Sequence, residues 1–327
     1  MQQNQEPFSV VVTSDRISPA AVELLSEKCR VSYTGSYAKP ADIARVIAER
    51  QTDGLIVRTS KVTREAIQAS PRLRVIAKHG IGVDNIDVAA ATEMKIPVLI
   101  SASANYRSVA EHALGLMLSL AKDIPFLDGR VRAGQWDKAT YQGVELFRKT
   151  LGLVGFGRIG RRLAELVAPF EMKVFVFDPF LTGEAPSGVT RVAEIGPLLK
   201  AADIVSLHLP LTEGTRHLIG AAELGMMKKT AWLINTARGG VVDEKALIDA
   251  LQTGAIAGAG LDTFAQEPPG NLEKLMTAGK VVLTPHVGAA TAESIVRMGV
   301  EAAQNVLTVL GGSRPDRGVM VNPEIYA

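Results

Sequence analysis

Four polar residues in the C-terminal half have types suited to acid–base chemistry on a small molecule. His286 ends the apolar run "KVVLTPH", and histidine suits proton transfer because its ordinary pKa is about 6.5. Asp262 and Glu267 lie in "LDTFAQEPP", where a carboxylate could hydrogen-bond the ring and fix its tautomer. Arg238 lies in "NTARGG", and a guanidinium can bind a carboxylate through two parallel hydrogen bonds.

Plainer interpretations of these residues stay open. His286 could be a core histidine without a task, and Arg238 and Glu267 could form surface ion pairs. Among the other histidines, His112 lies within a long apolar helix, and we expect it to be packed there or to lie between domains. The sequence has no Cys or His pair at ligand spacing, so we expect no metal site.

Three glycines predict a phosphate site. Gly155, Gly157 and Gly160 form G-x-G-x-x-G directly after an apolar run and open a predicted helix over 158–170. The first glycine would allow a tight turn, the second a close approach to a pyrophosphate, and the third close helix–strand packing. A helix N-terminus then offers free N–H groups to the phosphates.

An acidic residue after the next strand identifies the expected dinucleotide. Asp178 ends "KVFVFD", where a carboxylate grips the ribose hydroxyls. Pro179 and Phe180 follow, so no arginine is placed to bind a 2′-phosphate, which favours NAD over NADP. A purely structural glycine turn and an FAD site stay open as alternatives. His208 and Pro210, at the end of a later strand, would line the same cofactor cleft.

Apolar runs alternate with helical segments along the chain, which predicts parallel sheets with helical crossovers. The first block contains four or five strands and a helix over 18–29 that Ser18 caps. The second block begins at Leu151 and contains six strands, as in a dinucleotide-binding domain. The predicted strands are 8–14, 54–60, 73–80, 96–101, 151–156, 173–178, 202–210, 230–238, 258–264 and 280–286.

The helices outside these blocks set the expected domain boundaries. A helix over 108–124 begins with the capping-box pattern "SVAE", and a looser segment, 132–150, follows it. The last helix, 293–312, would return the chain to the first domain. We therefore expect two doubly wound α/β domains, in which a Rossmann NAD-binding domain is inserted in a flavodoxin-like substrate domain. The expected boundaries are 1–102 with 287–327 for the substrate domain and 103–286 for the NAD-binding domain.

The bulk composition fits an ordinary globular protein, which could be an enzyme or a binding protein. The chain has 327 residues, 47% hydrophobic residues and a formal net charge of +2, so no basic field points to nucleic acid or a membrane surface. Cys29 is the single cysteine and is expected to be a buried apolar residue. The first 15 residues show no signal-peptide pattern, and we expect a cytoplasmic protein.

Eight stretches across residues 50–310 together resemble the D-2-hydroxyacid dehydrogenase family, most closely its D-3-phosphoglycerate dehydrogenase branch. The stretches are "IVRTSKVT" (56–63), "GIGVDNID" (80–87), "SVAEHALGLML" (108–118), "KTLGLVGFGRIG" (149–160), "LHLPLTEGTRHLIG" (207–220), "INTARGGVVDEKAL" (234–247), "GLDTFAQEPP" (260–269) and "LTPHVGAAT" (283–291).

The resemblance implies roles for particular residues. His286 would exchange the proton, Glu267 would be its partner, and Arg238 would bind the substrate carboxylate. Backbone amides from His79 through Gly80, Ile81 and Gly82 to Val83 would also bind that carboxylate. The implied cofactor contacts, beyond the glycines and Asp178, are Arg158, Ile159, Thr236, Ala237, Arg238, Asp262, His286, Val287, Gly288 and Ala289. The family usually forms dimers through the cofactor domain, so a homodimer is expected.

Basic residues bear on the choice of substrate. Arg58, Lys78 and Lys138 could accept a phosphate or a second carboxylate. They favour 3-phosphoglycerate, with hydroxypyruvate, glyoxylate or another anionic 2-ketoacid as the alternative. The chain ends at Ala327, and we expect no C-terminal regulatory domain and no feedback control by serine. A function of another class, an NAD(H)-sensing protein like the family's transcriptional corepressors, stays open.

Overall fold

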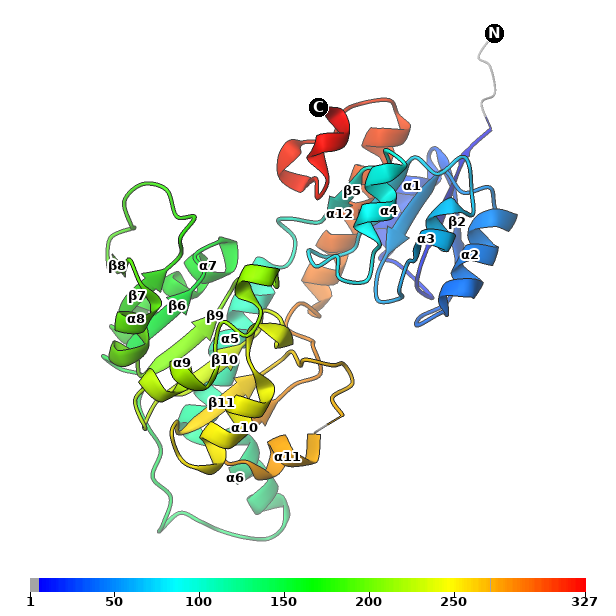
Figure 1. Cartoon of the computed structure of the whole chain (residues 1–327). Helices are drawn as coiled ribbons and strands as arrows, with labels where there is room; N and C mark the ends of the chain where they lie inside the picture. Colours follow the sequence, from blue (N-terminus) through cyan, green and yellow to red (C-terminus); the bar gives the residue numbers. More distant parts are fainter. Residues whose placement is uncertain (1–5, 271) are drawn as a thin grey trace. The chain divides into compact units, whose positions relative to one another are not determined.

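The computed structural model describes residues 6–270 and 272–327 (Figure 1). The chain divides into two compact units, unit 1 (residues 1–105 and 290–327) and unit 2 (residues 106–289). Residues 1–5, part of the stretch inspected for a signal peptide, lie outside the described residues. Within the described ranges, no helix combines the length and apolar character needed to cross a bilayer.

Unit 1 contains one parallel sheet in the order β2-β1-β3-β4-β5, which is the flavodoxin-like order. Its strands are β1 (Phe8–Val12), β2 (Cys29–Tyr33), β3 (Gly54–Val57), β4 (Val75–Lys78) and β5 (Val98–Ile100). All four residues of β3 are buried, because helices cover both faces of a parallel sheet.

Two helical layers enclose this sheet. Val10 and Val12 of β1 pack in one core cluster with residues of α1 and α12, whereas Val11 packs in a second cluster with residues of α2, α3 and α4. This alternation follows from the two-residue side-chain period of a strand. The helices are α1 (Pro19–Ser26), α2 (Pro40–Glu49), α3 (Arg64–Gln68), α4 (Val88–Glu93) and α12 (Ala292–Leu310), with 3-10 turns η4 (Arg317–Val319) and η5 (Pro323–Tyr326).

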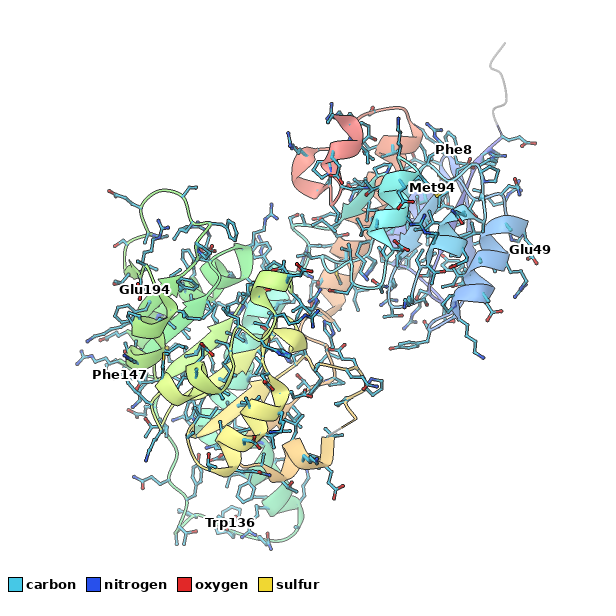
Figure 2. The ribbon with its side chains drawn as sticks, in the orientation of Figure 1. Phe8, Glu49, Met94, Trp136, Phe147 and Glu194 are labelled. Carbon is cyan, nitrogen blue, oxygen red and sulfur yellow. The ribbon has the colours of Figure 1, made fainter. Side chains whose placement is uncertain are left out.

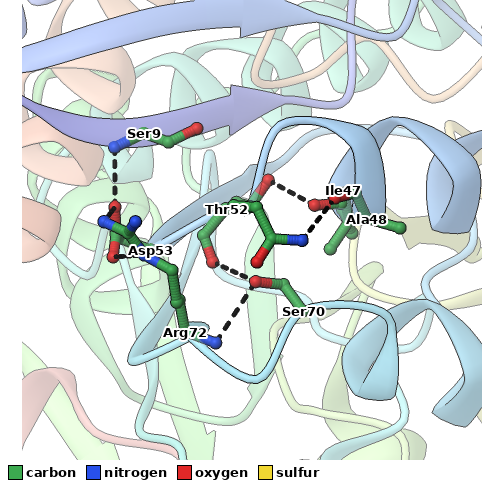
Figure 3. A network of polar contacts seen from close by, with 8 residues as sticks. Ser9, Ile47, Ala48, Thr52, Asp53, Ser70 and Arg72 are labelled. Atoms are coloured by element: carbon green, nitrogen blue, oxygen red, sulfur yellow. Dashed lines mark hydrogen bonds and ion pairs between the residues drawn. The ribbon is translucent and has the colours of Figure 1, made fainter.

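A buried carboxylate fixes the amino-terminal ends of β1 and β3 (Figure 3). Asp53 is 4% exposed and accepts a hydrogen bond from the Ser9 amide at 2.8 Å. Arg72 donates to the same carboxylate from Nε at 3.0 Å and from Nη2 at 3.1 Å. Ser70 Oγ donates to the Thr52 carbonyl at 2.9 Å. These bonds hold β1, the start of β3 and the segment before β4 together at the amino-terminal end of the sheet.

Unit 2 contains a seven-stranded parallel sheet in the order β12-β11-β10-β9-β6-β7-β8. The strand order reverses at β6, which is the Rossmann topology. The strands are β6 (Thr150–Val154), β7 (Lys173–Phe177), β8 (Val189–Arg191), β9 (Ile204–Leu207), β10 (Trp232–Asn235), β11 (Gly258–Leu261) and β12 (Val281–Leu283). The predicted fold class, two parallel-sheet α/β units, is confirmed.

Helices again form a layer on each face of this sheet. Residues of α5 and α7 share one core cluster, and residues of α8 to α11 share the other. The helices are α5 (Tyr106–Lys122), α6 (Ile124–Arg132), α7 (Arg158–Val167), α8 (Ile195–Ala201), α9 (Ala221–Met226), α10 (Glu244–Gln252) and α11 (Leu272–Thr277), with 3-10 turns η1 (Ala168–Phe170), η2 (Glu213–Thr215) and η3 (Gly239–Val241).

Several local predictions were wrong. Helix α1 ends at Ser26, since Cys29 begins strand β2, and Ser18 makes no side-chain capping bond. The "SVAE" capping box does not form, because α5 begins at Tyr106 and Ser108 lies buried in its first turn. The predicted helix 108–124 breaks at the left-handed residue Asp123, and α6 follows.

Candidate active site

Three neighbouring strands of unit 2 place the candidate catalytic residues. Asp262 directly follows β11, and Arg238 and His286 lie three residues beyond β10 and β12. These three strands lie side by side in the sheet. The carboxyl ends of parallel strands meet at one edge of a sheet, and ligands of doubly wound folds bind beyond that edge. The fold therefore brings these distant segments to one edge of the unit 2 sheet (Figure 1).

His286 and Glu267 form a hydrogen-bonded pair, with Nδ1 of the ring 2.8 Å from Oε2 of the carboxylate. Burial raises the pKa of Glu267, but the His286 ring, the Phe264 amide and the Arg238 charge outweigh it, and the pKa falls below its usual 4.5. An ionised carboxylate only accepts hydrogen bonds, so Nδ1 carries a proton. Nε2 is then the ring nitrogen that can exchange a proton with a substrate.

The backbone around His286 is held in an uncommon conformation. His286 has φ +54°, in the left-handed region that few non-glycine residues adopt. Its amide donates to the Thr284 carbonyl at 3.0 Å. The next two amides, of Val287 and Gly288, donate to the two oxygens of Asp262 at 2.9 and 2.8 Å. Asp262, which is 2% exposed, therefore fixes the turn that presents the His286 ring.

The Arg238 loop is anchored by Asn235 at the end of β10. The Asn235 amide donates to the Arg238 carbonyl at 3.0 Å, and its oxygen accepts from the Ala237 amide at 3.0 Å. At Gly239, a Cβ atom would lie 1.8 Å from the carbonyl carbon of Phe264. The two loops therefore touch through their backbones. Because the Phe264 amide donates to Glu267 at 3.1 Å, the Arg238 loop packs directly against the segment that holds the Glu267 carboxylate.

The three glycines of the turn differ in the space that a Cβ atom would find at each position. Gly155 has φ +93°, and a Cβ there would lie 2.3 Å from the His208 carbonyl oxygen. A Cβ at Gly160 would lie 2.5 Å from the Gly155 carbonyl oxygen. At Gly157, which precedes the first residue of α7, a Cβ would meet no atom of the described residues within 4 Å. The open position at Gly157 fits a group that comes from outside the chain.

Asp178 stands beside this turn. One of its carboxylate oxygens accepts from the Phe156 amide at 2.8 Å, and the other accepts from the Phe180 amide at 2.9 Å. The bond to Phe156 attaches the carboxylate to the glycine turn itself. A negative charge is thereby held at the carboxyl end of β7.

Two buried polar atoms at the same sheet edge lack a hydrogen-bond partner among the described residues: Thr236 Oγ1 and His208 Nδ1. The other ring nitrogen of His208 lies 2.9 Å from Ser206 Oγ. Burial lowers the pKa of His208 to about 3, so the ring is neutral. An unpaired buried polar atom costs about 1–3 kcal/mol. These two atoms and the open glycine therefore fit a polar dinucleotide at this edge.

The remaining predicted cofactor residues also belong to unit 2. Arg158 and Ile159 begin α7, and Pro210 is exposed three residues beyond β9. Ala237 is buried, and Ala289 is the last residue of the unit. Among the described residues, no group of three or more His, Cys, Asp and Glu side chains gathers to hold a metal ion.

Most of the predicted substrate residues lie at the carboxyl ends of β3 and β4 in unit 1. Lys78 Nζ donates to the Arg58 carbonyl at 2.6 Å and to Asn85 Oδ1 at 2.7 Å. Arg58 Nη1 donates to Ser14 Oγ at 3.1 Å, and burial, then the Arg16 charge, lower the pKa of Arg58. Burial also lowers the pKa of His79 to about 4.

The other predicted substrate residues differ in their exposure and in the unit to which they belong. Gly80 has φ +135° and Ile81 is exposed, followed by the half-buried Gly82. Lys138 is exposed and belongs to unit 2, on the loop after α6, so it is not part of the unit 1 cluster.

Sequence reasoning missed the residues that support the site. Asn235 and Thr284 lie inside the quoted stretches "NTARGG" and "LTPH", and their positions at strand ends were the signal that could have found them. His112 was predicted to be a packed helix residue. Its Nε2 lies 2.9 Å from Thr284 Oγ1 and 3.4 Å from Asp262 Oδ1.

Residues 114–288 match the model of the family D-isomer specific 2-hydroxyacid dehydrogenase, NAD binding domain. This chain belongs to that family, and unit 2 contains its NAD-binding domain. The chain is 40% identical to the D-3-phosphoglycerate dehydrogenase of Methanocaldococcus jannaschii, over 92% of this chain and 57% of the relative. It is also 40% identical to the hydroxypyruvate reductase of Thermotoga maritima, over 92% of this chain and 98% of the relative.

A solved structure shows the same architecture. The D-lactate dehydrogenase of Aquifex aeolicus, complexed with NAD and lactic acid, superposes with a TM-score of 0.84 at 28% identity, covering 96% of this chain and 99% of that one. The chain spans little more than half the length of the Methanocaldococcus relative.

Proposed function

We propose that the protein is an NAD-dependent dehydrogenase that interconverts a D-2-hydroxyacid and its 2-ketoacid. The observation that carries this proposal is the His286–Glu267 pair, 2.8 Å apart, at the same sheet edge as Arg238 and the glycine turn. When bound, NAD supplies the hydride acceptor or NADH the hydride donor for C2 of the substrate. The glycine turn, Asp178 and Thr236 would hold it.

The side chains of unit 2 supply the proton and the orientation. In reduction, protonated His286 donates the Nε2 proton to the C2 oxygen as that oxygen gains negative charge. In oxidation, neutral His286 removes the hydroxyl proton at the same atom. Glu267 stabilises the charged ring and keeps Nδ1 protonated. Arg238 binds the substrate carboxylate and polarises the adjacent carbonyl group.

Asp178 supports NAD over NADP as the cofactor. Its carboxylate is fixed by two backbone amides at the position where the ribose hydroxyls are gripped. A 2′-phosphate there would meet a fixed like charge, and the following residues, Pro179 and Phe180, supply no cation. We therefore expect NADH to be preferred over NADPH.

For the substrate, 3-phosphoglycerate is the leading candidate. Unit 1 carries Arg58 and Lys78 on neighbouring strand ends, and two cations suit the phosphate at the far end of such a molecule. Backbone amides of residues 79–83 would bind its carboxylate. The name of the Methanocaldococcus relative agrees with this choice.

Hydroxypyruvate or glyoxylate is the second candidate. The Lys78 ammonium already donates to the Arg58 carbonyl and to Asn85, which reduces what it can offer a phosphate. The name of the Thermotoga relative supports this candidate.

Steady-state rates on a small substrate panel test the proposal. We expect NADH oxidation with 3-phosphohydroxypyruvate, hydroxypyruvate or glyoxylate, and a higher kcat/KM with the phosphorylated compound. Arg58→Glu should remove that preference while leaving the rate with glyoxylate nearly unchanged. No NADH oxidation with any 2-ketoacid would contradict the proposal and favour a binding protein that only senses NAD(H).

We also propose that the protein forms a homodimer through unit 2. Helix α6 buries none of its residues in the chain, and Phe126, Val131 and Trp136 on and after it are more than half exposed. Trp136 lies on the loop that follows α6 (Figure 2). Arg130 and Asp137 form an ion pair at 2.6 Å that fixes this loop against the helix. An exposed apolar surface of this kind suits a second copy of the chain.

Sedimentation analysis tests the dimer directly. Phe126→Asp combined with Trp136→Ala should give monomers, whereas Phe180→Ala, at an exposed aromatic elsewhere in unit 2, should not change the assembly. A monomeric wild-type protein would contradict the dimer.

A further inference from the structure

A chain of hydrogen bonds connects helix α5 to the turn that carries His286. His112 Nε2 lies 2.9 Å from Thr284 Oγ1, and Thr284 Oγ1 lies 2.6 Å from Asp262 Oδ1. Asp262 in turn accepts the amides of Val287 and Gly288. The chain thus begins on a helix and ends on the two residues that follow the candidate catalytic ring.

The proton positions along this chain follow from the number of donors. Burial raises the pKa of Asp262, but His112, Thr284 and the two amides lower it further, below its usual 3.8. Asp262 is therefore an ionised acceptor, so the single hydroxyl proton of Thr284 is donated to it. Thr284 Oγ1 can then only accept from His112, which requires the proton on Nε2 of that ring.

The His112 ring also packs against the same turn. A Cβ atom at Gly288 would lie 3.4 Å from Cδ2 of His112 and 2.9 Å from Oδ2 of Asp262. The His112 side chain is 23% exposed, whereas Asp262 is 2% exposed. The His112 ring therefore lies close to the Asp262 carboxylate and leaves no room for a side chain at position 288.

We propose that His112 is a positioning residue for the reaction. By donating from Nε2 it holds the Thr284 hydroxyl in the one rotamer that serves Asp262, and Asp262 then keeps the His286 turn in its left-handed conformation. The inference rests on the proposed function, because it concerns the placement of the proton-exchanging ring. The role assigned to His112 is to place the turn that carries His286, and the proton exchange is assigned to His286.

Two pairs of variants test this role. Leucine at position 112 fills the space but cannot donate, whereas the glutamine amide nitrogen can donate from about the position of Nε2. We expect His112→Leu to lower kcat for 2-ketoacid reduction about tenfold, and to change the Kd for NADH by a smaller factor than kcat. His112→Gln should keep kcat within about threefold. Thr284→Val should reproduce the loss, and Thr284→Ser should rescue it.

A double-mutant cycle separates positioning from simple packing. The variant with both His112→Leu and Thr284→Val should be no slower than either single variant, because both break the same chain of bonds. His217→Asn, at an exposed histidine outside the site, is the matched control and should behave as wild type. If His112→Leu does not fold, the Thr284 pair reports on the same bond from its other partner.

The outcomes are distinct from a failure of the proposed function. An active wild type with unchanged kcat in His112→Leu overturns this inference alone. The positioning role is also overturned if His112→Gln is as slow as His112→Leu, or if the two single effects add. A wild type that reduces no 2-ketoacid overturns the proposed function instead.

Discussion

Each unit contains a buried aspartate whose carboxylate accepts backbone hydrogen bonds, but we expect the loss of each carboxylate to have a different effect. Asp53 in unit 1 accepts a backbone amide and two bonds from Arg72 at the amino-terminal end of its sheet. Asp262 in unit 2 accepts two backbone amides and the Thr284 hydroxyl at the carboxyl end of its sheet. The first carboxylate is paired with a cation, whereas the second is satisfied mainly by neutral donors.

The comparison distinguishes a buried carboxylate that stabilises the fold from one that positions a residue of the candidate active site. Asp53 joins two strand starts, and its guanidinium partner balances its charge, so its loss should be felt in folding. Asp262 fixes a single turn that carries a strained residue, His286. Strain of this kind persists where the surroundings impose it and is concentrated at functional sites. Its loss should be felt in turnover.

Among the residues that support the His286 ring, the largest effect is expected from Glu267→Gln. The amide keeps the size of the side chain but cannot stabilise a charged imidazole, and it can present the wrong group to Nδ1. We expect kcat to fall about 100-fold, while NADH titration by fluorescence gives an unchanged Kd. A kcat within threefold of wild type would show that Glu267 does not orient the ring.

The glycine turn offers a matched pair of substitutions next in size. Gly157→Val has open space within the chain, so the fold should be kept, but the side chain would occupy the expected pyrophosphate position. We expect the Kd for NADH to rise about tenfold or more, or about 1.4 kcal/mol. Gly155→Ala, by contrast, has φ +93° and a close carbonyl, so it should lower the melting temperature. Unchanged NADH binding in Gly157→Val would contradict the predicted cofactor site.

The comparison itself is tested by Asp53→Asn and Asp262→Asn. Asp262→Asn should lower kcat about tenfold, because one backbone amide of the turn then faces an NH₂ group. Asp53→Asn should cost about 1–3 kcal/mol of stability and leave kcat unchanged. Thermal unfolding measures the loss of stability in each variant, and steady-state kinetics measure the loss of activity. Equal losses of activity in both variants would remove the distinction.

A further prediction concerns the change of stability with pH that we expect from His208. Its folded pKa of about 3 lies below its ordinary 6.5, so the unfolded chain binds the proton first as pH falls. The contribution of the neutral ring to stability is therefore complete above pH 6.5 and is lost on acidification toward pH 3, by about 1.4 kcal/mol per pH unit. Urea unfolding at pH 7, 6 and 5 should show a small loss of stability from pH 7 to 6 and a larger loss from pH 6 to 5 in wild type, and smaller losses in His208→Leu. Parallel curves would contradict the burial argument.

The sequence predicted the sheet class and the strands that end at the site, because buried parallel strands are continuous apolar runs and the glycine spacing has a specific geometric meaning. It could not predict helix ends such as Tyr106, where tertiary packing overrides a local capping pattern. The short edge strand β8 was missed because three residues, mostly exposed, carry no periodic signal.

The sequence predicted the residues of the candidate site but not the contacts that hold them in place. His286, Glu267 and Arg238 stand out because each follows a strand. The approach of Gly239 to the Phe264 peptide and the bond from His112 to Thr284 join segments far apart in sequence. Such contacts depend on how the loops pack, and spacing along the chain carries no information about them.

The central claim is that the His286 ring exchanges the proton in the reaction. The most direct test is the turnover of His286→Gln with the best 2-ketoacid of the panel, measured together with its NADH affinity. We predict a fall in kcat of about 1,000-fold with a Kd for NADH within twofold of wild type. A variant that turns over at nearly the wild-type rate would contradict the claim.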